Sequence, residues 1–195
     1  MQGLEYELNV VQLGTGSAIW SDTDAAALRR DVGFPAVAHG SPRIGVLDFG
    51  NIVPTPAALC EFLVPLGEGV RSGRYGTFAL FVSAPDAATR EFVQYISAAR
   101  DFPVFLVPNA GIRSDATPAG ELTPTERATL DLLSRSGGTL TAADFAAGAG
   151  IGVTAAGNRL VNLSRRGYIH RIPQSGRAGD LFLDPRAVNP RPVAT

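Results

Sequence analysis

The chain has 195 residues, 45% of them hydrophobic, and its formal net charge is −1. This length and composition allow two small cores, and the nearly neutral balance excludes a uniformly basic nucleic-acid-binding protein. The single cysteine, Cys60, excludes an internal disulfide and a cysteine-rich zinc site, and we expect neither a metal nor a cofactor. All seventeen basic residues are arginine, which excludes a lysine-containing Walker loop.

Residues 1–108 alternate predicted strands and helices. Short apolar or alternating runs predict the strands, and apolar residues repeating every three or four positions predict the helices. Pro65 lies inside one helix and is expected to kink or shorten it. The alternation predicts an α/β sheet covered on both faces. The predicted strands are 4–11, 44–49, 78–82 and 102–107, and the predicted helices are 21–28, 56–70 and 86–99.

The segment Gly14-Thr15-Gly16-Ser17 follows the first predicted strand and is similar to the start of a dinucleotide-binding loop. The third glycine of such a loop is absent, so an ordinary turn and an anion-binding loop both remain open. Asp48, at the end of a later strand, is either a ligand-binding carboxylate or the cap of the following turn.

His39, Ser41 and Asp48 are the residue types of a hydrolytic triad. The sequence around Ser41 lacks the nucleophile elbow that would present the serine, so His39 is interpreted as a histidine in a surface loop. We therefore expect no catalytic residues and no enzymatic activity.

The run Val46-Leu47-Asp48-Phe49-Gly50-Asn51-Ile52, followed by a helix, resembles the corresponding region of the STAS-like family. The resemblance implies a mixed sheet with helices and a regulatory, protein-binding or ligand-sensing role for residues 1–108. In that family a serine just after this strand is often phosphorylated, and here Thr55 is the only hydroxyl available. The candidate ligand-binding or regulatory residues are Gly14, Gly16, Ser17, Asp48 and Thr55.

Residues 109–120 are rich in Gly, Pro, Ser and Asp and lack periodicity, which predicts a linker. Residues 187–195 contain two prolines and are expected to form an extended tail. The predicted domains are therefore 1–108 and 121–186.

Residues 121–186 predict three helices followed by a β-hairpin. Thr123 and Glu126 form a capping box at the first helix, with Pro124 at its first position. A second helix begins at Thr141, and a third runs from about Thr154 to Arg166 with Ala156, Leu160 and Leu163 on one face. Strands 169–172 and 181–183 pair across a glycine-containing tip. This topology typically places one helix in the DNA major groove.

The run Asn158-Arg159-Leu160-Val161-Asn162-Leu163-Ser164-Arg165-Arg166-Gly167-Tyr168-Ile169 resembles the recognition helix of winged helix-turn-helix regulators of the MarR type. The resemblance covers about a third of the chain. It implies that residues 121–186 are a winged helix-turn-helix domain that binds double-stranded DNA.

Arginine is concentrated in the C-terminal part. Residues 1–120 have eight Arg against twelve acids, a net charge of −4, and residues 121–195 have nine Arg against six acids, a net charge of +3. From Gly150 onward, seven Arg face two Asp, a net charge of +5. Such asymmetry is expected of a phosphate-contacting surface attached to a neutral domain.

The expected DNA contacts are of two kinds. Arg177 at the hairpin tip is expected to reach phosphates or a minor groove, whereas Arg165 and Arg166 either contact phosphates or stabilise the end of their helix. Asn158 and Asn162 can pair with adenine, and Arg159 with guanine. Gly157 on this face either permits close approach to DNA or indicates a helix that packs on a protein. The expected contact residues are Thr154, Ala155, Asn158, Arg159, Asn162, Arg165, Arg166, Arg171 and Arg177.

The sequence thus predicts a two-domain transcriptional regulator in which residues 1–108 receive a signal or form a homodimer and residues 121–186 bind DNA. Trp20, Phe34 and the helix of Phe62 are candidate dimer surfaces. Two alternatives remain open: a non-enzymatic adaptor whose winged helix binds protein, and a nucleotide-sensing Rossmann-type regulator.

No signal peptide opens the chain and no stretch is apolar for long enough to span a bilayer, so a cytoplasmic protein is expected. Abundant Ala, Gly, Arg and Pro without lysine indicate a GC-rich bacterial genome, or alternatively selection against lysine modification.

Overall fold

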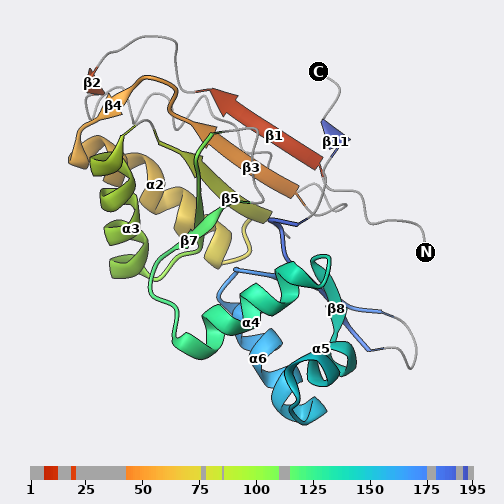
Figure 1. Cartoon of the computed structure of the whole chain (residues 1–195). Helices are drawn as coiled ribbons and strands as arrows, with labels where there is room; N and C mark the ends of the chain where they lie inside the picture. Colours follow the sequence, from red (N-terminus) through yellow and green to blue (C-terminus); the bar gives the residue numbers. More distant parts are fainter. Residues whose placement is uncertain are drawn as a thin grey trace. The chain divides into compact units, whose positions relative to one another are not determined.

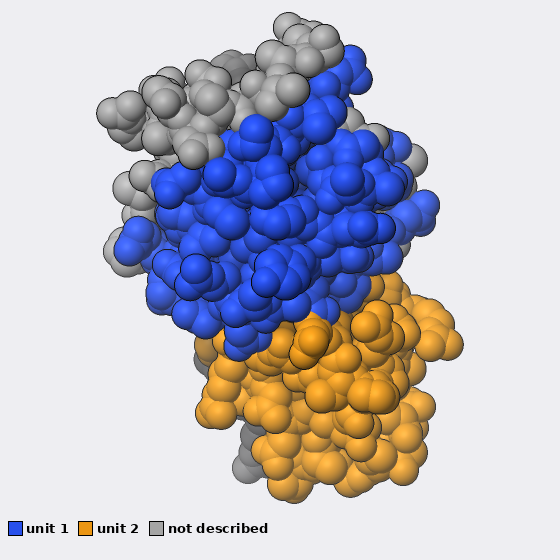
Figure 2. Space-filling view, turned by 90° about the vertical axis from the view of Figure 1, so that its left-hand side faces the viewer, with its two compact units in different colours: residues 1–120, 190–195 blue, residues 121–189 orange. Residues whose placement is uncertain are grey.

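A computed structural model of the chain describes residues 7–12, 19–20, 43–75, 78–84, 86–109, 115–174, 179–187 and 191–192. The chain divides into two compact units, coloured separately in Figure 2: unit 1 is Met1–Gly120 with Pro190–Thr195, and unit 2 is Glu121–Asn189. Unit 1 contains a mixed sheet with helices, and unit 2 contains helices and an antiparallel sheet. The expected mixed α/β class is confirmed.

The sheet of unit 1 has six strands in the order β11-β1-β3-β5-β6-β7 (Figure 1). All neighbouring pairs are parallel except β6 and β7, which are antiparallel. A separate parallel pair is formed by β2 and β4. The bounds are β1 Glu7–Gln12, β2 Ile19–Trp20, β3 Arg43–Asp48, β4 Val53–Pro54, β5 Phe78–Ser83, β6 Val104–Val107, β7 Thr117–Ala119 and β11 Arg191–Pro192.

Two helices, α2 (Pro56–Arg71) and α3 (Ala87–Arg100), pack side by side on one face of this sheet (Figure 1). Strands that follow one another across a sheet through right-handed crossovers place their helices on the same side. The resulting core joins Phe62 and Leu63 of α2 and Val93 of α3 to the strand residues beneath them. Phe62 itself is fully buried here, and the expectation that its helix supplies a dimer surface stays a prediction.

Helix α2 continues through Pro65 to Arg71, so the proline, which was expected to kink or shorten the helix, does not shorten it. The turn that follows the proline is held by buried residues, including Leu66 and Gly67. A Cβ atom at Gly67 would lie 2.3 Å from the Phe102 ring, so glycine permits the close approach of α2 to that side chain. Packing therefore compensates for the hydrogen bond that the proline removes.

The opposite face of the sheet is also apolar and buried. Ile44, Val46, Phe81, Phe105 and Val107 alternate in sequence with the residues of the helix-covered core, and each is at most 1% exposed. The rings of Phe81 and Phe105 stack with their centroids 5.0 Å apart. Burial on both faces is the expected property of a largely parallel sheet.

The predicted linker is partly ordered as a strand of unit 1. Thr117–Ala119 form β7 and pair with β6, and Ala119 is fully buried and accepts a hydrogen bond from the Ser97 hydroxyl. The predicted tail likewise contributes β11 to the sheet. Both segments thus contribute short edge strands to the sheet of unit 1, because backbone pairing can form despite a composition rich in Pro and Gly.

Unit 2 follows the order α4-β8-α5-α6-β9-β10, with a three-stranded antiparallel sheet ordered β8-β10-β9. A capping box opens α4 at Thr123, as expected from the sequence, and a second capping box opens α5 at Thr141, where a helix was expected to begin. Strand β8 was not expected; its Leu140 lies opposite Phe182 of β10. The bounds are α4 Pro124–Arg135, β8 Thr139–Thr141, α5 Ala142–Ala149, α6 Val153–Arg165, β9 His170–Ile172 and β10 Leu181–Leu183.

A buried ion pair joins the chain after β10 to helix α4. Arg186 donates hydrogen bonds to both carboxylate oxygens of Asp184 and to the backbone oxygen of Leu130. The Asp184 side chain is fully buried, and its backbone N–H donates to the oxygen of Gly138 at 2.8 Å. Gly138 has φ +77°, and a Cβ there would lie 2.3 Å from Ala187, so this turn requires glycine.

Replacing Asp184 by alanine is expected to lower the free energy of unfolding of unit 2 by about 3 kcal/mol, since it leaves the Arg186 charge buried without its carboxylate. Chemical denaturation of the full chain measures this loss. The double variant Asp184→Leu/Arg186→Met removes both charges and should recover most of the stability. Equal stability of Asp184→Ala and the wild type would contradict a structural role for the pair.

Candidate nucleic-acid interface

Helix α6 has one buried and one exposed face. Ala156, Leu160 and Leu163 are fully buried, and they repeat at the three- and four-residue spacing that puts them on one side of the helix. The opposite side carries most of the residues expected to contact DNA. Its exposed residues are Thr154, Ala155, Asn158, Asn162 and Arg165.

Two other expected α6 residues lie away from the centre of this face. Arg159 is half-buried at its margin, yet it forms no ion pair with any described residue. Gly157 is also half-buried, and a Cβ there would lie 3.9 Å from Ala142 of α5. Gly157 therefore lies on the side of α6 that packs against α5, and its expected position on the base-reading face is wrong.

Arg166 is engaged inside unit 2. Its guanidinium donates to Glu126 Oε1 at 2.8 Å and to the backbone oxygen of Glu121 at 2.8 Å. The same group lies 5.4 Å from the centroid of the buried Tyr168 ring. Arg166 thus joins the end of α6 to the start of α4, and a phosphate contact, the other role considered for it, stays a prediction.

Glu126 is shared between a helix cap and an ion pair. Its Oε2 accepts from the backbone N–H and the hydroxyl of Thr123, while its Oε1 accepts from Arg166. Partial burial alone would raise the pKa of Glu126, but the hydrogen bonds from Arg166 and Thr123 outweigh it and hold the pKa below the ordinary value of 4.5.

The remaining arginines of the C-terminal part differ in whether a carboxylate already pairs with them. Arg171 on β9 pairs through its Nε with Asp180, and Arg186 is buried as described above. Arg177, at the expected hairpin tip, lies outside the described residues. Among the described residues, Arg159 and Arg165 are therefore the cations of α6 without an ion pair, and the local positive charge is smaller than the sequence suggests.

The candidate regulatory residues of unit 1 have local structural roles where they are described. Asp48 Oδ1 accepts from the backbone N–H of Gly50 at 3.1 Å, so this carboxylate caps the turn after β3. Thr55 caps α2, its hydroxyl accepting from the backbone N–H of Ala58 at 3.2 Å. Gly14, Gly16 and Ser17 lie outside the described residues, as do His39 and Ser41.

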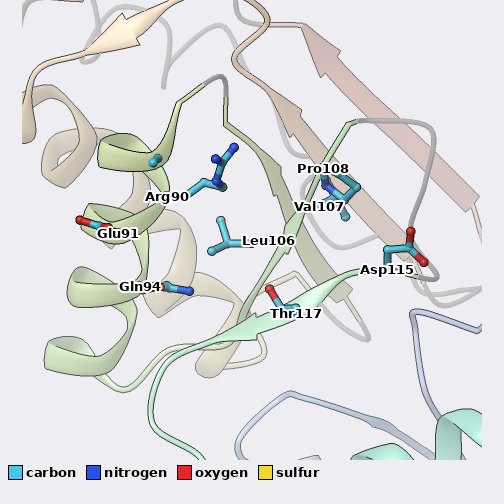
Figure 3. Close-up of a pocket in the computed structure, with 9 residues that line it drawn as sticks. Arg90, Glu91, Gln94, Leu106, Val107, Pro108, Asp115 and Thr117 are labelled. Atoms are coloured by element: carbon cyan, nitrogen blue, oxygen red, sulfur yellow. The ribbon is translucent and has the colours of Figure 1, made fainter.

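A pocket of about 530 Å³ opens beside the carboxyl end of β6 in unit 1. Figure 3 shows Arg90 and Gln94 on α3 facing Thr117 and Asp115 across Leu106. Arg90 also donates to the backbone oxygen of Ala84 at 3.2 Å, which orients it. This pocket was not predicted from the sequence. The available signal was the polar pair Arg90 and Gln94, which lie one helical turn apart beside the buried face of α3.

The described residues supply neither a metal site nor a membrane-spanning segment. Within the described ranges, no three His, Cys, Asp or Glu side chains are grouped to hold a metal ion. No described helix is long and apolar enough to cross a bilayer.

Cys60 is half-buried against the α2–α3 core rather than fully enclosed.

Comparisons with known proteins do not place the chain in a family. No family model matches its sequence. No curated protein and no solved structure matches it either. The resemblances to MarR-type regulators and to the STAS-like family therefore stay predictions based on the motifs quoted above.

The lowered pKa of Glu126 predicts a pH-dependent contribution to stability. This contribution is present above pH 4.5 and is lost as the pH falls through the lower folded-state pKa. Glu126→Gln is therefore expected to flatten the fall in stability below about pH 4.5, by less than about 1 kcal/mol because the pair is partly solvated. Denaturation at a series of pH values measures this slope. Asp131→Asn, an exposed change on the same helix, serves as control; identical slopes for both variants would contradict the assignment.

Proposed function

We propose that this protein is a non-enzymatic transcriptional regulator whose unit 2 is a winged helix-turn-helix that binds double-stranded DNA. The element order α4-β8-α5-α6-β9-β10, with β9 and β10 paired as a hairpin, supports this interpretation. In such domains the third helix enters the major groove and the hairpin lies beside it.

The exposed face of α6 carries the proposal. Thr154, Asn158, Asn162 and Arg165 all lie on it, and none packs into the core of unit 2. A helix that keeps hydroxyl, carboxamide and guanidinium groups along one solvent-exposed side has the donors and acceptors that base edges and phosphates require.

Regulation of DNA binding would act through unit 1. The pocket beside β6 combines one cation, two carboxylates, a carboxamide and a hydroxyl with apolar residues, which suits a small polar signal molecule. The carboxyl ends of parallel strands are also where α/β sheets usually bind ligands.

Binding as a homodimer is part of the proposal, because two copies would read two half-sites about one helical turn apart. Sedimentation of the protein with and without a bound duplex is expected to give two chains per site. A single chain on each bound duplex at micromolar concentration would contradict this arrangement.

An adaptor that binds protein through α6 is the second candidate. Val153 is 57% exposed at the start of α6, and Ala155, two residues further along the helix, is exposed as well. The pairing of Arg166 and Arg171 with carboxylates also leaves less free positive charge for DNA. Capture of a protein on α6 without retention of duplex DNA would favour this function.

Arg165→Ala is expected to weaken duplex binding to all sequences by a similar factor, because an exposed arginine at the end of α6 contacts phosphate rather than a base. The slope of log K against log salt concentration should fall by about 1. Fluorescence anisotropy with random-sequence duplexes at several salt concentrations measures both quantities.

Arg127→Ala, an exposed arginine change on α4, is the matched control and should leave the slope unchanged. An equal loss in both variants would indicate a general charge effect. Absence of duplex retention by the wild type at low salt would overturn the proposed function.

A further inference from the structure

Two asparagines lie one helical turn apart on the exposed face of α6. Asn158 and Asn162 are both exposed, and neither side chain forms a hydrogen bond with any described residue. Four residues of helix correspond to a separation of about 6 Å along its axis. The buried stripe of Ala156, Leu160 and Leu163 on the opposite side fixes this orientation.

Neither asparagine stabilises α6 as a helix former or as a cap. Asparagine is a weaker helix former than alanine, and these two lie in the middle and last third of a 13-residue helix rather than at its ends. Other polar side chains of unit 2 have local roles: Thr123, Thr141 and Glu126 cap helices, and Arg166 joins two of them. The two carboxamides are therefore available to an external partner.

We infer that Asn158 and Asn162 read two adenines in the major groove; this inference rests on the proposed function. A carboxamide can donate from its NH₂ to adenine N7 while its oxygen accepts from the N6 amino group. In the major groove, adenine presents this neighbouring acceptor and donor, and guanine, cytosine and thymine do not.

The spacing specifies the bound sequence further. Residues three or four positions apart on a recognition helix contact successive base pairs, so Asn158 and Asn162 reach neighbouring base pairs. Ala155, on the same face, has a side chain small enough to let the helix approach the groove. The half-site therefore contains two adjacent A·T pairs.

Selection of bound duplexes from a random library tests the inference with the full-length protein. The wild type is expected to enrich adenine at two neighbouring positions. Asn158→Ala and Asn162→Ala should each lose the preference at one of them, with affinity for the selected site falling about 5- to 150-fold. Asn51→Ala, an exposed asparagine change in a turn of unit 1, is the matched control and should leave the motif unchanged.

Two further measurements separate base reading from a loss of folding. Asn162→Asp should shift its position from adenine to cytosine, because a carboxylate accepts from the cytosine amino group. Replacing adenine by 7-deazaadenine at either position should weaken wild-type binding, because this base lacks the N7 acceptor. The same replacement should not further weaken the variant that lacks the matching asparagine.

The outcomes distinguish the inference from the proposed function. A sequence motif that persists unchanged in both alanine variants would overturn the role of the asparagines while leaving the regulator in place. Binding of all duplexes with equal affinity would do the same. Failure of the wild type to retain any duplex at low salt would overturn both proposals.

Discussion

The burial of Ala156, Leu160 and Leu163 is the constraint on which unit 2 depends. Once these side chains enter the core, helical geometry determines which α6 residues remain in contact with solvent. The polar side chains of that helix are therefore gathered on one face without any need for mutual attraction. Helix α6 is held by packing against α5 and α4. This packing does not constrain which residues occupy its exposed face.

Arginine has two different uses in unit 2. Arg166 and Arg186 are held by carboxylates and backbone oxygens, and they join segments that are far apart in the sequence. Arg165 has no ion pair with a described residue. A count of charges along the chain treats these arginines as equal, although guanidinium groups that are already paired contribute little to an external phosphate.

Much of the secondary structure could be predicted from the sequence, because caps and apolar periodicity are local signals. The capping box at Thr123 was predicted and is present, and the second helix begins directly after Thr141 as predicted. Strands β7 and β8 were missed, because each has only three residues and depends on a neighbouring strand for its hydrogen bonds. The α6 face was predicted from spacing alone, whereas the partners of Arg166 were not, since Glu126 precedes it by forty residues.

The sheet of unit 1 ends on both sides in a very short strand that contains a proline. Strand β7 has Pro118 and strand β11 has Pro192, and neither residue has an N–H to donate to another chain. Short edge strands with proline discourage edge-to-edge aggregation. Strand β11 pairs with Glu7 and Leu8 of β1, so a protein shortened before residue 190 would lose this pairing and expose the backbone edge at these two residues. An exposed strand edge can pair with another chain, so residues 191–192 protect this part of the sheet edge from self-association.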